Sequence, residues 1–288
     1  MLRAIMLTQP LTDLSAWTAH FRQAPIPVLE ATLEELALLA QAEEEHGNVD
    51  AHRVSEAVGD DPLMTLRLLV QAAQQRHARQ ITDAETVTAA VMMMGIAPFF
   101  RSCTELAAVE PLLAAHPQAW AGLQHVLRRS HRAAQFAIGF AVHRMEDDAA
   151  VMRQAALLHD FAEMLLWCHA PALAAEIAAR QRADPALRSE AVQREVLNVS
   201  LLELEQSLMR AWHLPELLIR LTDDRAEGVA LIYPQMRLVK LAVQLARHTE
   251  QGWNNAALPD DLSEIADLLN LSQAATKRLL HDIDDIDA

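Results

Sequence analysis

Apolar residues recur at three- and four-residue spacings along nearly the whole chain, which is the period of one face of an α-helix. The pattern begins with Leu29, Leu33 and Leu36, and its longest stretch runs from about residue 118 to residue 145. The alternation typical of β-strands is rare, and only 7 of the 288 residues are glycine. The chain is therefore predicted to be all-α.

Prolines and polar caps divide this pattern into separate helices. Residues 24–27 contain two prolines and are expected to be extended, because proline lacks an N–H and restricts the residue before it. Asp61 can cap a helix whose first position is Pro62, and Ser200 with Glu203 forms a capping box. We also expect one helix over residues 98–109 and one over residues 154–167.

Composition excludes several classes of function. A formal net charge of -15 argues against a nucleic-acid partner, because binding a phosphate backbone needs clustered Lys and Arg. No uncharged apolar run reaches about 18 residues, so no membrane span is expected. The apolar part of the N-terminus is too short for a convincing secretory signal. Cys103 and Cys168 form no CxxC motif and fit a reducing cytosol, so a cytoplasmic protein is expected.

The most conspicuous polar group is the pair His159-Asp160, which lies among leucines in the predicted helix 154–167. An imidazole and a carboxylate in apolar surroundings cost desolvation energy unless they are paired. Either the two residues belong to a divalent-metal site of the kind found in phosphohydrolases, or they serve packing and hydrogen bonding. In the second case His159 would donate to a carbonyl or carboxylate, and Asp160 would accept from His131, a backbone N–H or an arginine.

No other catalytic motif is evident. The chain has no glycine-rich phosphate loop, no nucleophile elbow and no HExxH sequence. Cys168 and His169 are adjacent, but neighbouring residues on a helix point about 100° apart, which is poor geometry for a thiolate–imidazole pair.

The order of short motifs resembles the HDOD domain, the HD-related output domain of bacterial signalling proteins. The resemblance spans roughly residues 22–250 and implies a helical fold related to HD phosphohydrolases, with a role in signal transduction. It rests on the segments 24–29, 61–69, 81–87, 130–131, 155–160 and 198–216.

This resemblance also suggests a division of the chain. We expect a lead-in over residues 1–24 and an HDOD domain over residues 25–250. Within the domain, an N-terminal helical lobe would cover 25–115 and an HD-like helical lobe 116–250. A C-terminal helical tail would occupy 251–288 and end in a solvated acidic run.

The departures from the family pattern bear on activity. The family's usual His-Asp-Ile-Gly-Lys reads His159-Asp160-Phe161-Ala162-Glu163 here, and the histidines that often follow the Trp-Gly-Leu-Pro turn are absent. Where a late aspartate would stand, the chain has Val243, which cannot bind a metal. Asp223 or Asp224 could substitute from the preceding loop, although the spacing gives no reason to expect it.

The resemblance therefore implies a degenerate metal site. We expect no catalytic, cofactor-binding or metal-binding residues. His131, His159 and Asp160 are the vestigial candidates if a metal does bind, and Fe, Mn or Zn enters only under an enzymatic alternative.

Two main functions follow. The chain is expected to be a catalytically inactive signalling adaptor or output module, whose partners would be a response regulator, a sensor kinase or cyclic-dinucleotide enzymes. The alternative is a metal-dependent HD-type phosphohydrolase or phosphodiesterase that acts on a nucleotide or cyclic dinucleotide. A third hypothesis is a receptor for a small anion, with Arg128, Arg129 and Arg132 around His131. The sequence leaves a homodimer open.

Overall fold

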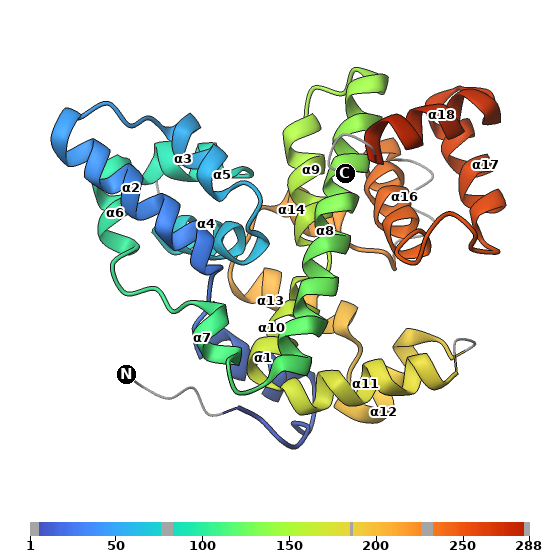
Figure 1. Cartoon of the computed structure of the whole chain (residues 1–288), viewed down its shortest axis with the longest axis horizontal. Helices are drawn as coiled ribbons and strands as arrows, with labels where there is room; N and C mark the ends of the chain where they lie inside the picture. The colour runs from blue at the N-terminus through green and yellow to red at the C-terminus, as the bar shows by residue number, and fades with distance from the viewer. Residues whose placement is uncertain (1–5, 76–82, 185–186, 226–232, 285–288) are drawn as a thin grey trace. The chain divides into compact units, whose positions relative to one another are not determined.

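The computed structural model describes residues 6–75, 83–184, 187–225 and 233–284, and within these ranges it contains helices and no strand. The all-α prediction is confirmed. The helices are α1 (Leu14–Gln23), α2 (Glu30–His46), α3 (Ala51–Val58), α4 (Pro62–Gln75), α5 (Val87–Met94), α6 (Ile96–Ser102), α7 (Val109–Leu113), α8 (Pro117–Arg144), α9 (Ala149–Leu158), α10 (Phe161–His169), α11 (Pro171–Ala183), α12 (Ser189–Leu197), α13 (Leu201–Ala211), α14 (Glu216–Leu221), α16 (Pro234–His248), α17 (Leu258–Leu269) and α18 (Gln273–Asp284) (Figure 1). Among the described helices, none has the length and apolar character needed to cross a membrane.

The chain forms two compact units. Unit 1 comprises Met1–Val126 and Asp160–Pro215, and unit 2 comprises Leu127–His159 and Glu216–Ala288. The chain thus passes from unit 2 to unit 1 between His159 and Asp160. These contact-based units differ from the lobes expected at 25–115 and 116–250, and the extents of those lobes stay a prediction.

The first helices of unit 1 enclose an apolar core. Helix α3 packs on α2 and α5, and α5 packs on α4 and α6. The buried side chains of this core are Val28, Leu36, Val49, Val54, Ala57, Val58, Met64, Leu68, Val87, Val91 and Phe99. Residues 25–27 lie outside any helix, in keeping with their prolines, and Val28 pairs with Ala108 in an isolated parallel bridge.

Helix α10 anchors the rest of unit 1. It contacts α4, α7, α11 and α13, and its ring of Phe161 packs at 5.8 Å from that of Trp212. The predicted lead-in includes α1, which packs on α13 through the buried Trp17. The indole Nε1 of Trp17 donates to the carbonyl of Leu197 at 2.8 Å. Helix α1 is therefore an integral part of unit 1.

Unit 2 is built from the second half of α8 with α9, α14, α16, α17 and α18. Helix α16 packs against α9, α14 and α17, and α17 packs on α18 (orange to red in Figure 1). Arg144 ties the end of α8 to α17 by donating from Nη1 to the carbonyl of Leu268 at 2.6 Å. The acidic run predicted at the C-terminus lies partly at 285–288, outside the described residues.

The predicted caps agree with the structure. The Oδ1 atom of Asp61 accepts from the backbone N–H groups of Leu63 and Met64 at 2.9 and 3.0 Å. Its Oδ2 atom accepts from Leu29 N at 2.8 Å, so one buried carboxylate serves two segments. Ser200 and Glu203 form the predicted capping box.

Two helix predictions are wrong. The helix expected at 98–109 ends at Ser102, and α7 begins only at Val109, because residues 107–109 leave the helix to bond with Val28. The stretch 154–167 is two helices, with a break at His159 and Asp160. An apolar run shows helical period on both sides of such a break, so periodicity alone does not reveal it.

Candidate functional site

The His159-Asp160 pair lies at the junction of α9 and α10 and not within a helix. His159 caps the C-terminal end of α9, and Asp160 stands before α10 with φ −111° and ψ 22°. Both side chains are buried, at 4% and 9% of their full exposure. The break sends the His159 side chain into unit 2, where it meets residues from other helices.

The carboxylate that His159 meets is that of Asp224. The Nε2 atom of His159 lies 3.2 Å from Oδ2 of Asp224, which follows the short helix α14. Helix α14 packs on both α9 and α16, which places this loop at the end of α9. The contact is not a well-aligned hydrogen bond, and its main effect on Asp224 is electrostatic.

The other ring nitrogen of His159 faces Arg247 on α16. The Nη2 atom of Arg247 lies 3.4 Å from Nδ1 of His159. A guanidinium can only donate, so this contact is a hydrogen bond only when Nδ1 carries a lone pair and the ring proton is on Nε2, towards Asp224. A metal is bound by a ring nitrogen lone pair. In this arrangement the one lone pair of the imidazole is directed at a cation of the protein itself.

Positive side chains dominate the electrostatics around Asp224. Burial on its own would raise the pKa of this carboxyl. The interactions with His159, Arg247 and Lys240 outweigh burial and hold its pKa below the ordinary value. Lys240 and Arg247 both lie on α16. Asp224 is therefore an anion held close to positive side chains of α16.

The three vestigial candidates do not form a ligand set. Within the described ranges, no group of three or more His, Cys, Asp or Glu residues is placed to hold a metal ion. His131, His159 and Asp160 all fall in those ranges, and His131 is half-buried on α8. Val243, at the position of the expected late aspartate, is buried on α16.

The sequence gives no reason to expect Asp224 at this site and no signal for Arg247. Asp224 was visible as the second of two acids in the loop after the turn at 213–215. Nothing in its spacing to His159 indicates the contact, because the two residues are 65 positions apart and are joined only by the packing of α14 on α9.

The predicted arginine pocket around His131 is partly neutralised. The guanidinium of Arg132 donates to both oxygens of Asp284 at 2.8 and 2.9 Å. Arg129 lies 3.8 Å from Glu250. Two of the three arginines thus face carboxylates of unit 2, which weakens the hypothesis of an anion receptor at this place.

Cys168 and His169 do not act as a pair. The Nε2 atom of His169 lies 2.9 Å from the carbonyl oxygen of Pro25. Burial raises the pKa of the Cys168 thiol and lowers the pKa of His169 to about 4. A neutral thiol next to a neutral imidazole supports a structural role, since the thiolate is the reactive form of cysteine.

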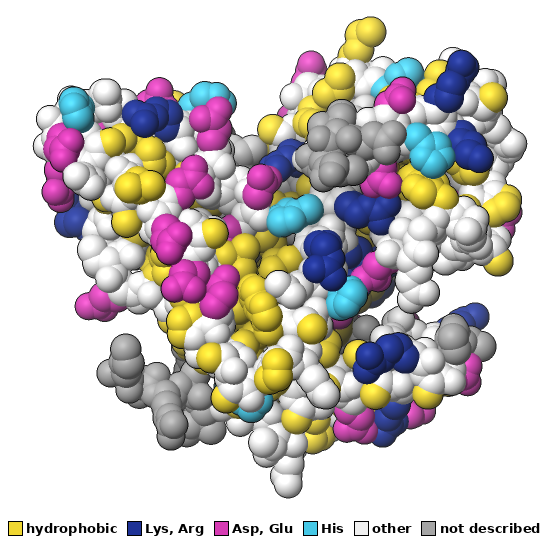
Figure 2. Space-filling model, in the orientation of Figure 1, with side chains coloured by type: hydrophobic (Ala, Val, Ile, Leu, Met, Phe, Trp, Pro, Cys, Tyr) yellow, Lys and Arg dark blue, Asp and Glu magenta, His cyan; other side chains and the backbone are white. Residues whose placement is uncertain are grey.

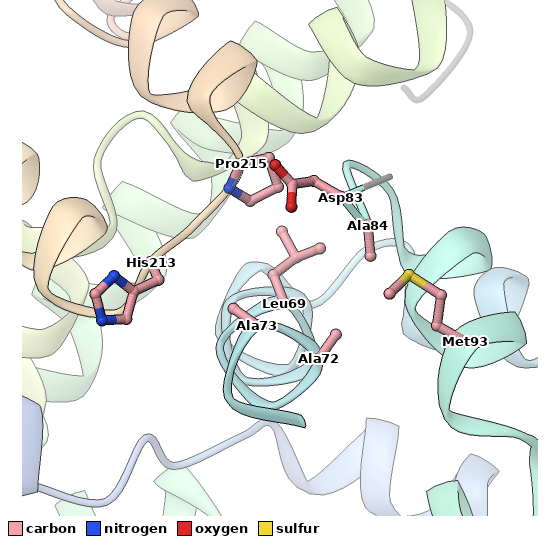
Figure 3. A pocket seen from close by; sticks show the side chains of 8 residues that line it. All are labelled: Leu69, Ala72, Ala73, Asp83, Ala84, Met93, His213 and Pro215. Atoms are coloured by element: carbon pink, nitrogen blue, oxygen red, sulfur yellow. The ribbon is translucent and has the colours of Figure 1, made fainter. Parts of the chain in front are cut away.

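Unit 1 carries a shallow hollow formed by α4, the segment before α5 and the turn after α13. Its cavity volume is about 10 Å³, and it is open to solvent. Figure 3 shows Leu69 at its floor and the carboxylate of Asp83 directed over Leu69 towards Pro215, while the imidazole of His213 points away. The lining residues are Leu69, Ala72, Ala73, Asp83, Ala84, Met93, His213 and Pro215.

The sequence matches the family model of the HDOD domain over residues 26–226. No curated protein matches the chain. The match covers most of unit 1 and less than half of unit 2, and it includes His159, Asp160 and Asp224.

Solved structures show a similar fold. The chain resembles the "MmoQ Response regulator" from Methylococcus capsulatus str. Bath, with a TM-score of 0.66 and 20% identity over 90% of this chain and 98% of that one. It also resembles a "virulence factor" from Campylobacter jejuni subsp. jejuni, with a TM-score of 0.62 and 16% identity over 94% of this chain and 95% of that one. At these identities the likeness shows the fold alone.

Proposed function

This chain belongs to the HDOD domain family, and we propose that it is a catalytically inactive signal-transduction module that regulates a partner protein by binding to it. The proposal has two parts. The first is that the HD-related site in unit 2 is structural. The second is that a surface of the chain recognises another protein.

The contacts of both ring nitrogens of His159 support the first part of the proposal, a structural role for the site. Nδ1 faces the guanidinium of Arg247 and Nε2 faces the carboxylate of Asp224. Metal-assisted hydrolysis needs several ligands and an open position for water. Here Arg247 and Lys240 already bring positive charge to the carboxylate of Asp224. The contact between His159 and Asp224 would then serve to hold α9, α14 and α16 together.

Surface charge supports the second part. Figure 2 shows acidic side chains over the part of unit 1 that contains α2 and α3, with apolar side chains between them. The hollow of unit 1 combines an apolar floor with the carboxylate of Asp83. A carboxylate has several acceptor positions, so Asp83 can meet a partner's cation in addition to contacts within the chain. An apolar floor below a carboxylate suits a Lys or Arg side chain of the partner, with its methylene groups over Leu69 and its charge near Asp83.

The partners we propose are other signalling proteins of the cytoplasm. A response regulator, a sensor kinase or an enzyme of cyclic-dinucleotide metabolism would fit an HDOD output role. A basic, partly apolar segment on that partner would be attracted by the acidic surface, and such attraction increases association rates.

The alternative function is a metal-dependent phosphohydrolase or phosphodiesterase. His159 and Asp224 would have to become ligands, which requires Arg247 to withdraw from Nδ1. Fe, Mn or Zn would then supply the Lewis acid that activates water. The position of Lys240 and Arg247 disfavours this function, because each adds a positive charge close to the carboxylate.

Partner capture tests the proposal. We would express the tagged full chain in its native cells, cross-link it and identify the bound proteins. The Asp83→Lys variant is expected to lose its main signalling partner, whereas the control Glu105→Lys, at an exposed residue outside the hollow, should keep it. Equal capture by both variants would show that the hollow around Asp83 does not bind the partner. Hydrolysis of bis(p-nitrophenyl) phosphate that depends on Mn²⁺ and on His159 would favour the enzyme.

A further inference from the structure

A buried carboxylate joins α17 to two side chains of α16. Asp261 lies in the first turn of α17 and is 2% exposed. Its Oδ1 atom accepts from Nε2 of Gln244 at 2.7 Å, and its Oδ2 atom lies 2.6 Å from Nδ1 of His248. Gln244 and His248 are four residues apart and so share one face of α16. His248 is therefore held by a buried acid that a second hydrogen bond fixes in place.

The contact with Asp261 also decides which nitrogen of His248 is reactive. A carboxylate accepts hydrogen bonds, so this contact is a hydrogen bond when Nδ1 carries the ring proton. The lone pair of the ring is then on Nε2. A carboxylate behind the opposite nitrogen fixes the orientation of an imidazole and makes its lone pair more basic. Nε2 is thus the nucleophilic atom of this ring.

The Nε2 atom of His248 is accessible to solvent. The side chain is 31% exposed, although that of Asp261 is buried. Among the described residues, Nε2 has no hydrogen bond or ion pair, and it is not one of the buried atoms that lack a partner. A lone pair whose direction is set by a buried acid therefore reaches the surface.

Three other histidines beside a carboxylate lack one of these features. His46 and His52 face glutamates that are themselves exposed. An exposed ion pair holds its two side chains only weakly in one geometry. In His159 both ring nitrogens already face other side chains. His248 combines a buried carboxylate on one nitrogen with an open position on the other.

We propose that Nε2 of His248 accepts a phosphoryl group from a phosphorylated histidine of a partner protein. The lone pair of Nε2 attacks phosphorus, and the P–N bond of the donor breaks. The donor imidazole leaves and takes a proton from water, while the proton on Nδ1 of His248 stays in its hydrogen bond. The phosphorylated ring of His248 carries a positive charge, which the carboxylate of Asp261 balances.

Phosphoryl transfer fits this histidine better than metal binding or general base catalysis. The described part of the chain contains no group of three His, Cys, Asp or Glu residues that could hold a metal ion. A general base needs a substrate bound within hydrogen-bond reach, and His248 lines neither the hollow at Leu69 nor the one along α18. A covalent acceptor needs only an accessible nucleophile, because the partner brings the phosphoryl group to it.

Phosphorylation would weaken the contact between α16 and α17. A phosphoryl group brings a charge of about −1.5 to −2, of which the ring offsets one. His248 is the last residue of α16, where the helix dipole is negative and added negative charge is unfavourable. The phosphoryl group on His248 therefore acts as a switch on the packing of α17.

This inference rests on the proposed function only for the donor, which would be a sensor kinase or another signalling partner. The reactivity of His248 is measured with a small donor and without a partner. A failed partner capture leaves that measurement unaffected, and an unreactive His248 leaves the capture experiment unaffected.

Treatment of the full chain with potassium phosphoramidate, a small P–N donor, tests the proposal. Mass spectrometry at alkaline pH locates the phosphoryl groups, and ³¹P NMR distinguishes the two ring nitrogens. His248 is expected to be labelled first, on Nε2, ahead of the exposed His46. Asp261→Asn should slow this labelling about tenfold, because the carboxylate behind the ring is lost. His248→Gln should abolish it, and His46→Gln should leave it unchanged.

Two results would overturn the proposal. One is labelling of His46 before His248 in the wild type, a comparison that needs no variant. The other is an unchanged rate at His248 in a folded Asp261→Asn variant. Thermal unfolding checks the fold, and Gln244→Ala, which removes the second hydrogen bond of Asp261, replaces a variant that does not fold. Hydrogen exchange in α17 should be faster in the labelled chain, and unchanged exchange would exclude the effect on packing.

Discussion

His159 and Asp224 approach each other to 3.2 Å between Nε2 and Oδ2, although one ends α9 and the other follows α14. The imidazole is almost fully buried, and Arg247 covers its other nitrogen. His159 and Asp160, although adjacent, therefore have different structural roles. His159 contacts Asp224 and Arg247 within unit 2, while Asp160 begins the part of the chain that returns to unit 1.

Removing the carboxylate of Asp224 should destabilise the protein. The Asp224→Asn variant leaves His159, Lys240 and Arg247 without their anion, and we expect a loss of about 1–3 kcal/mol in the free energy of unfolding. Asp223→Asn is the control, because Asp223 pairs with the exposed Arg225 two residues on, and it should cost less than about 0.5 kcal/mol. Urea unfolding measures both. Equal losses would show that the network around His159 contributes nothing specific.

Stability should fall between pH 6.5 and pH 4 because of His169. Burial lowers the pKa of this imidazole from 6.5 to about 4. As the pH falls through this range, the unfolded chain binds a proton that the folded chain does not, so unfolding becomes more favourable. The full loss is about 3 kcal/mol, and it is complete below pH 4.

The variant His169→Gln tests this assignment. Glutamine stays neutral over the whole range, so the pH dependence of unfolding between 6.5 and 4 should become shallower by most of that amount. His20, next to His169 and with its own pKa lowered by burial, adds dependence of the same sign that remains. The exposed His46→Gln should leave the curve unchanged. An unaltered slope in His169→Gln would refute the role of His169.

Asp61 should be one of the least replaceable polar residues of unit 1. Its carboxylate is 2% exposed and accepts from the N–H groups of Leu29, Leu63 and Met64. Asp61→Ala leaves these donors without their partner and should cost about 2–4 kcal/mol. Asp61→Asn, which keeps one acceptor oxygen, should cost less.

Asp50 provides the matched comparison for Asp61. It also caps a helix, accepting from His52 N and Arg53 N at the start of α3, but it is exposed. Water can satisfy its donors, so Asp50→Ala should cost clearly less than Asp61→Ala. Chemical denaturation of the two alanine variants measures the difference. Similar values would mean that burial of Asp61 has no influence on its contribution.

The helical fold was predictable because it depends on local signals. The period of leucines, the Asp61-Pro62 cap and the Ser200–Glu203 capping box act within a few residues of one another, and each agrees with the structure. The long helix expected at about 118–145 is α8, at Pro117–Arg144. The break at His159 and the early end of α6 were missed, because contacts with distant segments decide them.

The site was predictable only in part for the same reason. The sequence indicated that His159 and Asp160 are special and that the site departs from the family pattern. It did not indicate that Asp224 and Arg247 meet His159, since these contacts require the packing of α9 with α14 and α16. The grouping of His131 with the doublet, as candidates if a metal binds, stays a prediction.

Metal content is the most direct test of the central claim that the HD-related site is structural. The full chain would be purified from cells supplied with Fe, Mn and Zn, and its metals counted beside those of His159→Ala. If the Arg247 and Asp224 contacts occupy the imidazole, both proteins should contain far less than one equivalent, and adding Mn²⁺ or EDTA should not change the melting temperature of the wild type. Near-stoichiometric metal in the wild type that is lost in His159→Ala would contradict the account.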